Sequence, residues 1–329
     1  MLYNELGKTD ISISYMALGC WALISDLTWG KQDENDSIAT IYAALDHGIN
    51  FFDTAEMYGN GCSESLLGKA LKNHRHECII ASKVSSTPMK KDVVKNACEK
   101  SLKRLRTDYI DLYQIHWIDR SVPLSDTMEA FDELKKEGKI LAIGVCNGSR
   151  GDISLLTNLV QLETDQLPYS LLWRAIEYDI YDKCIEKDIG ILCYSSLAQG
   201  LLTGKFNTAD DVPDGRARTR HFSRKRPNAK HGEDGCEKET FKAIAKIRSI
   251  CEEINEPMAN VSLAWILQKR GVTSVLVGAR NPEQIKKNVK ALDLKLSGEV
   301  VSKLSKVTEK VKEILGPNAD LWQSDSRFM

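Results

Sequence analysis

INFFDTAEMYGNG, at residues 49–61, is the stretch on which the interpretation of the whole chain depends. It opens with an apolar run at 49–52 that is long enough for one buried strand and ends at Asp53. Tyr58 and two glycines follow, so the backbone is expected to bend directly after the strand. The pattern predicts a carboxylate and a phenol on the rim where a strand gives way to a loop. An Asp in this place is more often a turn or helix-cap residue.

Similar apolar runs alternate with helical patterns along the rest of the chain, and eight strand-like runs result. Strands that alternate with helices are typical of a parallel sheet, and eight such units favour a closed (β/α)8 barrel, the TIM-barrel fold. A doubly wound open sheet is the alternative, but no G-x-G-x-x-G turn follows the first run. The runs span 15–19, 49–52, 78–82, 109–115, 140–145, 160–164, 190–194 and 272–277.

The other elements are predicted from local signals. Residues 2–6 and 11–14 predict an N-terminal β-hairpin that plugs one end of the barrel. Asp36 is the expected cap of the first barrel helix, and residues 175–186 are expected to form another of these helices. Apolar residues at helical spacing in 297–315 predict an extra C-terminal helix that packs on the outside.

Acidic and basic residues nearly cancel, since 45 Lys and Arg against 46 Asp and Glu leave a formal net charge of -1. This balance indicates neither nucleic acid nor an anionic membrane as a partner. No apolar stretch reaches membrane-spanning length and the N-terminus lacks the order of a secretion signal, so the cytoplasm is the expected location. Nine scattered cysteines without a C-x-x-C pair indicate free thiols and no metal site. No feature indicates an oligomeric state.

A basic segment at residues 204–237 interrupts the alternation after the seventh strand-like run. Its composition is most typical of a solvated, mobile loop. Nucleic-acid binding is not indicated, because interleaved aromatic residues and a basic domain are both lacking. A third interpretation follows from its place in a barrel, namely a loop that folds over an anionic ligand at the mouth. The basic residues include Arg216, Arg218, Arg220, His221, Arg224, Lys225 and Arg226.

Ionisable residues stand at the ends of three consecutive strand-like runs. Asp53 ends the second run, Lys83 the third and His116 the fourth, at intervals of about one βα unit. Tyr58 lies in the loop after Asp53, so all four side chains are predicted to meet at one mouth of the barrel. Each has an ordinary structural alternative: Lys83 as a salt-bridged strand end, for example, or His116 as a core histidine.

Together these four residue types suit proton transfer to an oxygen atom. A phenol has a pKa of about 10, and a nearby ammonium is expected to lower the pKa of Tyr58. Asp53 would keep Lys83 charged and in place, while His116 would hydrogen-bond the oxygen that receives the proton. A carbonyl group polarised in this way accepts hydride, which requires a cofactor.

Eight motifs carry a resemblance to a known family: GCW (19–21), FFDTAEMYGNG (51–61), ASKV (81–84), DLYQIHW (111–117), GVCN (144–147), QLPYSLLWR (166–174), YSSLAQGLLTGKF (194–206) and VGARNPEQIKKN (277–288). On these motifs the chain resembles the aldo-keto reductases over nearly its whole length. The resemblance implies one (β/α)8 barrel domain, 1–329, which reduces an aldehyde or ketone to an alcohol. It places the family's catalytic tetrad on Asp53, Tyr58, Lys83 and His116, with Tyr58 as general acid.

The resemblance also implies a binding site for NADP(H), preferred over NAD(H). Asn147 and Gln166 would bind the nicotinamide carboxamide, Tyr194 would stack on the ring, Lys205 would lie at the pyrophosphate and Arg280 at the adenosine 2′-phosphate. The full implied set is Trp21, Asp53, Cys146, Asn147, Gln166, Tyr194, Ser195, Leu197, Lys205, Gly278, Arg280, Gln284 and Asn288.

The sequence around Arg280 supports this assignment, because Asn281 is a good helix cap, Pro282 suits a first helical position, and a helix N-terminus attracts phosphate. An ordinary capped helix with a surface arginine is the alternative. The chain departs from the family at Cys146 and Ser196, where relatives often have Ser and Pro. A thiol is a weaker hydrogen-bond partner than a hydroxyl, which affects the expected nicotinamide contact. At Lys287, relatives often have an acid.

A substrate pocket is expected beside the tetrad. Trp29, Met57 and Trp117, together with Trp21, form an amphipathic set, and the tail at 316–329 is a candidate to close the mouth. Similarity to bacterial members associated with sugar and polyol metabolism suggests a small hydroxylated aldehyde or ketone as substrate.

Two other functions remain open at this point. The chain also resembles the potassium-channel β subunits, which implies an NADP-binding sensor or regulatory subunit with little turnover. A barrel lyase that uses Lys83 to form a Schiff base is the third hypothesis.

Overall fold

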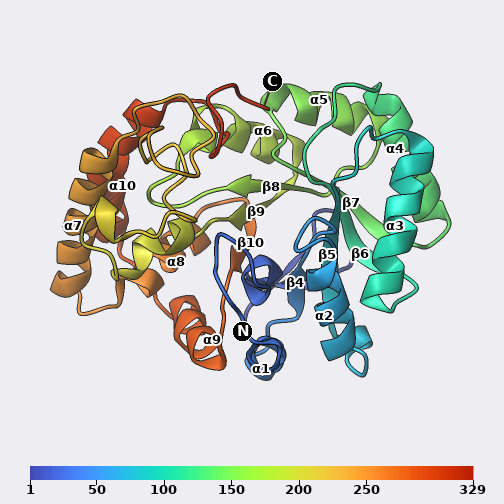
Figure 1. The fold of residues 1–329 in the computed structure, drawn as a ribbon, viewed down its shortest axis with the longest axis horizontal. Coiled ribbons are helices and arrows are strands. Elements are labelled where there is room, and N and C mark those ends of the chain that lie inside the picture. The colour runs from blue at the N-terminus through green and yellow to red at the C-terminus, as the bar shows by residue number, and fades with distance from the viewer. Residues whose placement is uncertain (329) are drawn as a thin grey trace.

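The computed structural model describes residues 1–328, in which eight parallel strands close into a barrel (Figure 1). The strands follow one another around the barrel in chain order, and the last pairs with the first. The closed barrel confirms the predicted fold and excludes the open sheet. The strands are β3 (Met16–Gly19), β4 (Phe51–Asp53), β5 (Ile79–Val84), β6 (Ile110–Ile115), β7 (Ile140–Cys146), β8 (Thr164–Pro168), β9 (Gly190–Tyr194) and β10 (Val272–Val277).

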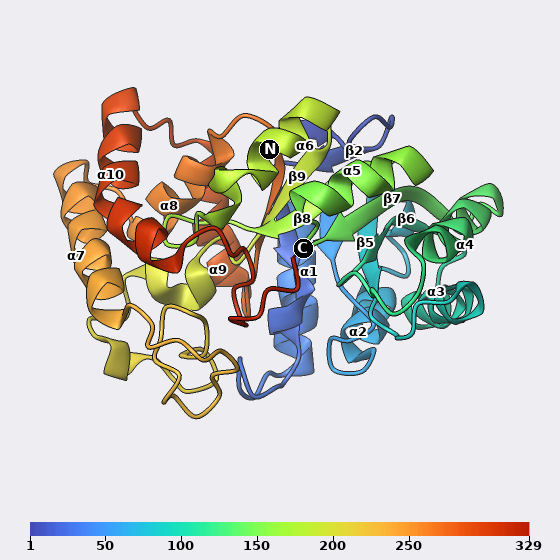
Figure 2. The same ribbon diagram turned by 90° about the horizontal axis from the view of Figure 1, so that it is seen from above.

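Helices surround the barrel, and the C-terminal helix α10 packs beside α7 on the outside (Figures 1 and 2). This arrangement confirms the predicted extra helix. The helices are α1 (Glu34–Asp46), α2 (Cys62–Ala70), α3 (Lys91–Leu105), α4 (Leu124–Lys136), α5 (Arg150–Leu159), α6 (Ile180–Lys187), α7 (Glu237–Glu253), α8 (Met258–Leu267), α9 (Pro282–Asn288) and α10 (Gly298–Leu315). No helix within residues 1–328 is both long and apolar enough to cross a bilayer.

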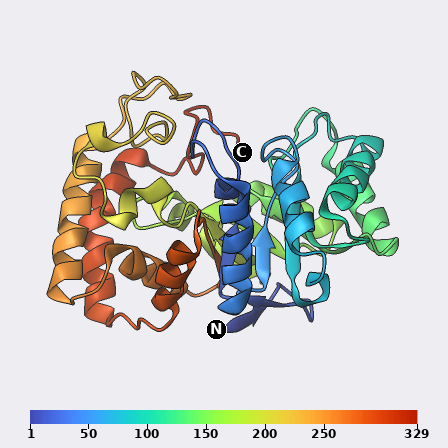
Figure 3. The ribbon, with the colours of Figure 1, turned by 60° about the horizontal axis from the view of Figure 1, so that its bottom comes forward.

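The N-terminal hairpin, β1 (Tyr3–Glu5) and β2 (Ser12–Ser14), closes the end of the barrel opposite the long loops (Figure 3). Leu6 and Ile13 are fully buried and pack with inward-facing residues of the barrel strands, among them Phe51. The hairpin therefore plugs the barrel as predicted. The cluster inside the barrel comprises Leu6, Ile13, Ala17, Phe51, Ala81, Leu112, Ala142, Leu192 and Leu276.

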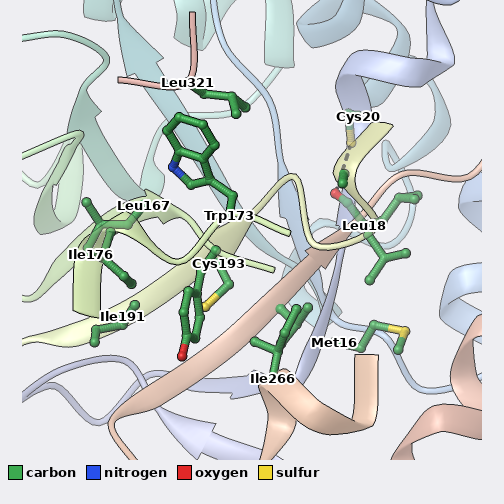
Figure 4. Packing of buried hydrophobic residues seen from close by; sticks show 14 of the residues in the cluster. Met16, Leu18, Cys20, Leu167, Trp173, Ile176, Ile191, Cys193, Ile266 and Leu321 are labelled. Carbon is green, nitrogen blue, oxygen red and sulfur yellow. Dashed lines mark hydrogen bonds between the residues drawn. The ribbon is translucent and has the colours of Figure 1, made fainter. Parts of the chain in front are cut away.

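A larger core fills the space between the barrel and the helices. In Figure 4, Leu321 of the C-terminal tail lies over Trp173, with Leu167 and Ile176 nearby. Leu321 is only 3% exposed, so the tail is anchored in this core. All nine cysteines are free, in agreement with the sequence analysis.

Three predicted boundaries are wrong. The first helix is capped by Asp33, which accepts hydrogen bonds from the N–H groups of Asn35 and Asp36, so Asp36 lies inside the helix. The strand expected at 160–164 is β8, which starts only at Thr164. The prediction is shifted because β8 contains polar residues such as Asp165 and Gln166, which a search for apolar runs does not detect. The helix expected at 175–186 is split into a 3-10 turn and α6.

The contact between α2 and α3 depends on Gly68. A methyl group at this position would lie 2.5 Å from the carbonyl carbon and oxygen of Leu105. We therefore expect Gly68→Ala to lower the free energy of unfolding by about 1–3 kcal/mol, as measured by chemical denaturation. Gly298→Ala is the matched control, because no atom lies within 4 Å of the added methyl group at the start of α10. Equal losses in both variants would contradict the close-contact explanation.

Candidate active site

A cavity of about 1090 Å³ opens at the C-terminal ends of the barrel strands. Its walls include strand-end residues such as Gly19, Asp53 and Tyr194, together with loop residues such as Tyr58. All predicted cofactor residues line this one cavity, and so do the predicted pocket residues Trp29, Met57 and Trp117. The barrel topology thus brings together residues that are spread over most of the chain.

Asp53, Tyr58 and Lys83 form one hydrogen-bonded cluster at the base of the cavity. The Lys83 ammonium lies 2.6 Å from Asp53 Oδ1 and 3.4 Å from the Tyr58 hydroxyl, and it donates to the Thr54 carbonyl at 2.8 Å. Lys83 has no exposed surface and lies beneath the cavity wall. Asp53 and Lys83 form an ion pair because they lie on the adjacent strands β4 and β5.

His116 joins this cluster from the end of β6. Its ring lies edge-on to the Tyr58 ring, with centroids 5.8 Å apart, and Ser85 Oγ is 2.7 Å from His116 Nδ1. A Ser85 hydroxyl that donates to Nδ1 leaves an N–H on Nε2. Burial, together with the nearby Lys83 and Arg327 cations, lowers the pKa of His116 to about 3, so the imidazole is neutral at pH 7.

The expected lowering of the Tyr58 pKa is wrong for this structure. Burial raises the pKa of Tyr58 to about 12 and outweighs the opposing effect of the Lys83 ammonium. The phenol is therefore protonated at neutral pH and suited to donate a proton. Burial acts to lower the pKa of Lys83, but Asp53 and the other surrounding groups raise it overall, so Lys83 stays charged. A buried, charged ammonium is a poor nucleophile, which argues against the Schiff-base lyase.

Amides and a phenol surround the base of the cavity beside the tetrad positions. Gln166 Nε2 donates to Asp53 Oδ2 at 2.7 Å, and the Tyr194 hydroxyl donates to Asn147 Oδ1 at 2.9 Å. Cys146 is buried, and its thiol lies 3.7 Å from Gln114 Oε1 within the barrel. Burial raises its pKa well above that of an ordinary thiol, so Cys146 remains protonated.

The loop after β9 has an unusual backbone. Ser195, Ala198 and Gln199 have positive φ angles of 52°, 46° and 53°, and Gly200 follows with 97°. Where a residue with a left-handed backbone conformation follows one with a right-handed conformation, successive backbone N–H groups point into one concavity, which can bind an anion. Both polar atoms of the Gln199 side chain are buried without a hydrogen-bond partner among residues 1–328. A side chain at Gly200 would also meet the Lys205 ammonium at 3.0 Å.

Positive charge dominates the wall of the cavity. Asp53 is the one carboxylate among the described lining residues, and Lys83 pairs with it. Burial and the neighbouring Arg216 and Arg280 cations lower the pKa of Lys205. The lining cations are Lys205, Arg216, Arg218, Lys230, Arg280, Lys287, Lys290 and Arg327. Such a wall favours a ligand with several negative charges.

The profile of the Aldo/keto reductase family matches residues 15–309. The chain belongs to the aldo/keto reductase family. Among curated relatives, this aldo/keto reductase is 36% identical to Aldo-keto reductase YhdN of Bacillus subtilis, with 87% of each chain covered. It is 35% identical to the NADH-specific methylglyoxal reductase of Escherichia coli over 89% of this chain and 94% of that protein. A putative voltage-gated potassium channel subunit beta of Schizosaccharomyces pombe is 31% identical over 93% and 92% of the two chains.

Solved structures give the same family. The glycerol dehydrogenase AKR11B4 from Gluconobacter oxydans superposes with a TM-score of 0.80 at 28% identity, with 96% of each chain covered. An aldo-keto reductase from Klebsiella pneumoniae in complex with NADPH superposes with a TM-score of 0.73 at 29% identity, over 94% of this chain and 96% of that chain.

The region around Arg280 in this aldo/keto reductase is built as predicted. Asn281 caps α9 by accepting a hydrogen bond from the Gln284 N–H at 3.0 Å, and Pro282 opens the helix. Arg280 Nε donates to Gln32 Oε1 at 2.8 Å, and its Nη2 bonds the Lys31 carbonyl. The Gln32 contact was not predicted, because a separation of 248 residues leaves no local sequence signal.

The basic segment 204–237 is not simply a solvated loop. Arg220 is only 4% exposed and His221 only 2%. Arg220 donates to the carbonyls of Asn318 and Leu315, which ties the segment to the C-terminal tail. These contacts bring Arg216 and Arg218 of the segment to the cavity wall, where neither had been assigned individually to the site.

The C-terminal tail also reaches the cavity. Trp322, Gln323 and Arg327 line it, and the Arg327 guanidinium lies 3.3 Å from the centre of the Trp117 ring. The tail therefore contributes to the cavity wall, and its closing of the mouth stays a prediction. Residue 329 of that tail lies outside the described residues.

Proposed function

We propose that this aldo/keto reductase reduces an aldehyde or ketone to an alcohol with NADPH, and that Tyr58 is the general acid. The observation that carries the proposal is the Asp53–Lys83–Tyr58 cluster, which presents a protonated phenol beside a neutral histidine at the base of a large cationic cavity. Bound NADPH supplies the hydride that the carbonyl carbon receives. The protein supplies the proton and the geometry.

The proton-transfer residues act in defined roles. The Tyr58 hydroxyl donates its proton to the carbonyl oxygen as negative charge develops there, and an N–H on His116 Nε2 donates a second hydrogen bond to the same oxygen. Lys83 stabilises the phenolate that Tyr58 leaves behind. Asp53 holds the ammonium at 2.6 Å, and the Gln166 amide holds the second carboxylate oxygen.

The residues present suit a dinucleotide phosphate. Asn147 and Gln166 would bind the nicotinamide carboxamide and Tyr194 its ring. The left-handed loop with Ser195 and Leu197, together with Lys205, would hold the pyrophosphate. The unpartnered Gln199 amide and the buried, unpartnered Nε of Arg216 offer further polar contacts at this end. Gly278, Arg280, Gln284 and Asn288 would surround the adenosine 2′-phosphate and the adenine.

The preference for NADPH rests on Arg280. The Escherichia coli relative is named NADH-specific and the Klebsiella structure holds NADPH, so the family accommodates both dinucleotides. We expect Arg280→Ala to weaken NADPH binding by about 10- to 100-fold, because charge-assisted hydrogen bonds to a phosphate are lost, and to leave NADH binding within about threefold. Protein fluorescence titration with both nucleotides measures this difference. Lys286→Ala, an exposed cation on α9 outside the cavity wall, is the control.

Turnover distinguishes the reductase from the sensor alternative. The relatives named for methylglyoxal reduction and glycerol dehydrogenation support small, hydroxylated or oxidised three-carbon compounds as a first substrate panel. We expect multiple turnovers of NADPH with members of that panel, followed by absorbance at 340 nm. Tight NADPH binding with very slow release and no turnover would favour the sensor, in line with the potassium channel β-subunit relative.

A further inference from the structure

Three alternating arginines of the basic segment have three different environments. Arg220 binds backbone carbonyls of the tail and is structural. Arg216 lies 5.4 Å from the Phe206 ring, in the same group as Lys205. Arg216 therefore belongs to the cation group at which the dinucleotide phosphates are proposed to bind. Arg218 lies at a different part of the cavity wall, beside Trp21 and Trp322.

Arg218 is half-buried near two indole rings. Its guanidinium carbon is 4.6 Å from the centre of the Trp322 ring and 5.7 Å from that of Trp21. Nη2 donates to Thr28 Oγ1 at 3.0 Å, and Nε is buried with no hydrogen-bond partner in the described part of the chain. Stacking on aromatic faces holds a guanidinium in place while its N–H fork stays available.

No carboxylate of residues 1–328 lies within ion-pair distance of Arg218. Asp26 is the acid with the largest electrostatic effect on it, but its oxygens already accept from Trp21 Nε1 at 2.7 Å and from the N–H groups of Thr28 and Trp29. Arg327, the cation beside Trp117, differs in this respect. Two hydrogen bonds of 2.6 and 2.9 Å join it to Asp320, so its charge already has a carboxylate partner.

Arg218 also lies close to the proton donor. Trp21 stacks on Tyr58, with ring centroids 5.9 Å apart and an angle of 18° between the planes. Trp21 is therefore a neighbour of both the phenol and the guanidinium, and Trp29 lies edge-on to Trp21. Arg218 and Tyr58 line the same cavity, so a cation without a carboxylate partner among the described residues stands on the wall that also carries the proposed proton donor.

We propose that Arg218 binds an anionic group of the substrate, so that the preferred substrates are small carbonyl compounds carrying a carboxylate or a phosphate close to the C=O group. The proposal rests on the proposed reductase function. It makes Arg218 a specificity-determining residue. The tail completes the site. Leu321 is buried in the core (Figure 4), and Trp322, the next residue, contacts the guanidinium.

Matched substrate pairs test the proposal. Glyceraldehyde 3-phosphate is compared with glyceraldehyde, and a short aldehyde carboxylate with its methyl ester, so that the two arms separate phosphate from carboxylate recognition. We expect the wild-type protein to prefer the anionic member of at least one pair by about 10-fold or more in kcat/KM. Arg218→Met should lower this ratio of anionic to neutral kcat/KM by about 10- to 100-fold, mostly through a higher KM for the anionic substrate. Arg218→Lys keeps the charge without the fork and should fall between the two.

Control variants separate Arg218 from the other arginines. Arg224→Met, in the same segment but exposed and paired with Asp234, should leave the ratio unchanged. Arg216→Met should weaken NADPH binding instead. A wild-type protein without a preference for either anion would overturn the proposal. So would an Arg218→Met variant that weakens NADPH binding at an unchanged ratio, because Arg218 would then belong to the dinucleotide site.

A binding measurement keeps this test separate from the proposed function. Malonate and inorganic phosphate are titrated into the protein with NADP+ present, and tryptophan fluorescence is followed, since Trp21 and Trp322 flank Arg218. Saturable quenching that Arg218→Met abolishes supports the anion site even if no carbonyl compound turns over, in which case only the reductase function fails. No saturable change with either anion, in a protein that reduces neutral carbonyl compounds, overturns the anion site alone.

Discussion

Tyr58→Phe is expected to lower kcat for carbonyl reduction on the order of 10²- to 10⁴-fold, because the proposed general acid is removed while the ring remains. Among the described residues, Tyr58 carries the one phenol within hydrogen-bond distance of the Lys83 ammonium, at 3.4 Å. No neighbouring residue is therefore expected to replace it as the proton donor. NADPH binding should change by less than about threefold, since the lost interaction is made mainly in the transition state. Steady-state kinetics and a fluorescence titration on the same preparation measure both quantities.

Tyr113→Phe is the control for removing a buried phenolic hydroxyl. Tyr113 is fully buried and does not line the cavity, and its hydroxyl has no hydrogen-bond partner among the residues that the structure describes. Its substitution should leave kcat unchanged. Comparable kcat values for Tyr58→Phe and the wild type would remove Tyr58 from the mechanism.

The protonation states of the same residues lead to an expected pH profile. The pKa of Tyr58 is raised to about 12 and that of His116 is lowered to about 3. Both groups therefore keep their proton-donating, uncharged forms between about pH 5 and pH 9, and kcat for reduction should be nearly flat there. A bell-shaped profile centred near neutrality would show instead that the phenol is tuned as first expected from its ammonium neighbour.

The position of the tetrad residues was predictable because it depends on topology. Once alternating strands and helices indicate a parallel barrel, residues at the ends of β4, β5 and β6 must share one mouth. Asp53, Lys83 and His116 needed no knowledge of side-chain packing to be grouped. The cofactor residues at the ends of β7, β9 and β10, such as Asn147, Tyr194 and Gly278, were instead implied by the family resemblance, and they line the same cavity.

The pKa of Tyr58 was not predictable from residue types. The sequence shows an ammonium near a phenol, but the degree of burial decides which electrostatic effect is larger, and burial is a property of the packed fold. Contacts between the basic segment and the tail also escaped prediction. Arg218 and Trp322 lie about one hundred positions apart and approach each other only because Arg220 and Leu321 anchor their segments.

The largest expected loss of stability is that of Lys83→Met. Lys83 and Asp53 form an ion pair in which the side chains are 0% and 3% exposed. Removing one partner leaves an unpaired buried charge, which we expect to lower the free energy of unfolding by about 3–5 kcal/mol. The double variant Asp53→Asn/Lys83→Met removes both charges and should recover a large part of this loss, although it remains inactive. Urea denaturation of the wild type, Asp53→Asn, Lys83→Met and the double variant gives the coupling energy between the two charges.

The pH dependence and a surface control complete this test. Because the pKa of Lys83 is raised in the folded protein, its stabilisation is fully present below the ordinary lysine pKa of about 10.4 and is lost only above it. Lys83 thus stays charged in the wild-type protein from about pH 6 to pH 9, and the destabilisation by Lys83→Met should be present throughout that range. Lys303→Met, which breaks an exposed pair with Glu299, should cost about 0–1 kcal/mol. Two results would contradict a stabilising interaction between the buried charges. One is a similarly small loss of unfolding free energy in Lys83→Met and Lys303→Met, and the other is a double variant that is no more stable than Lys83→Met.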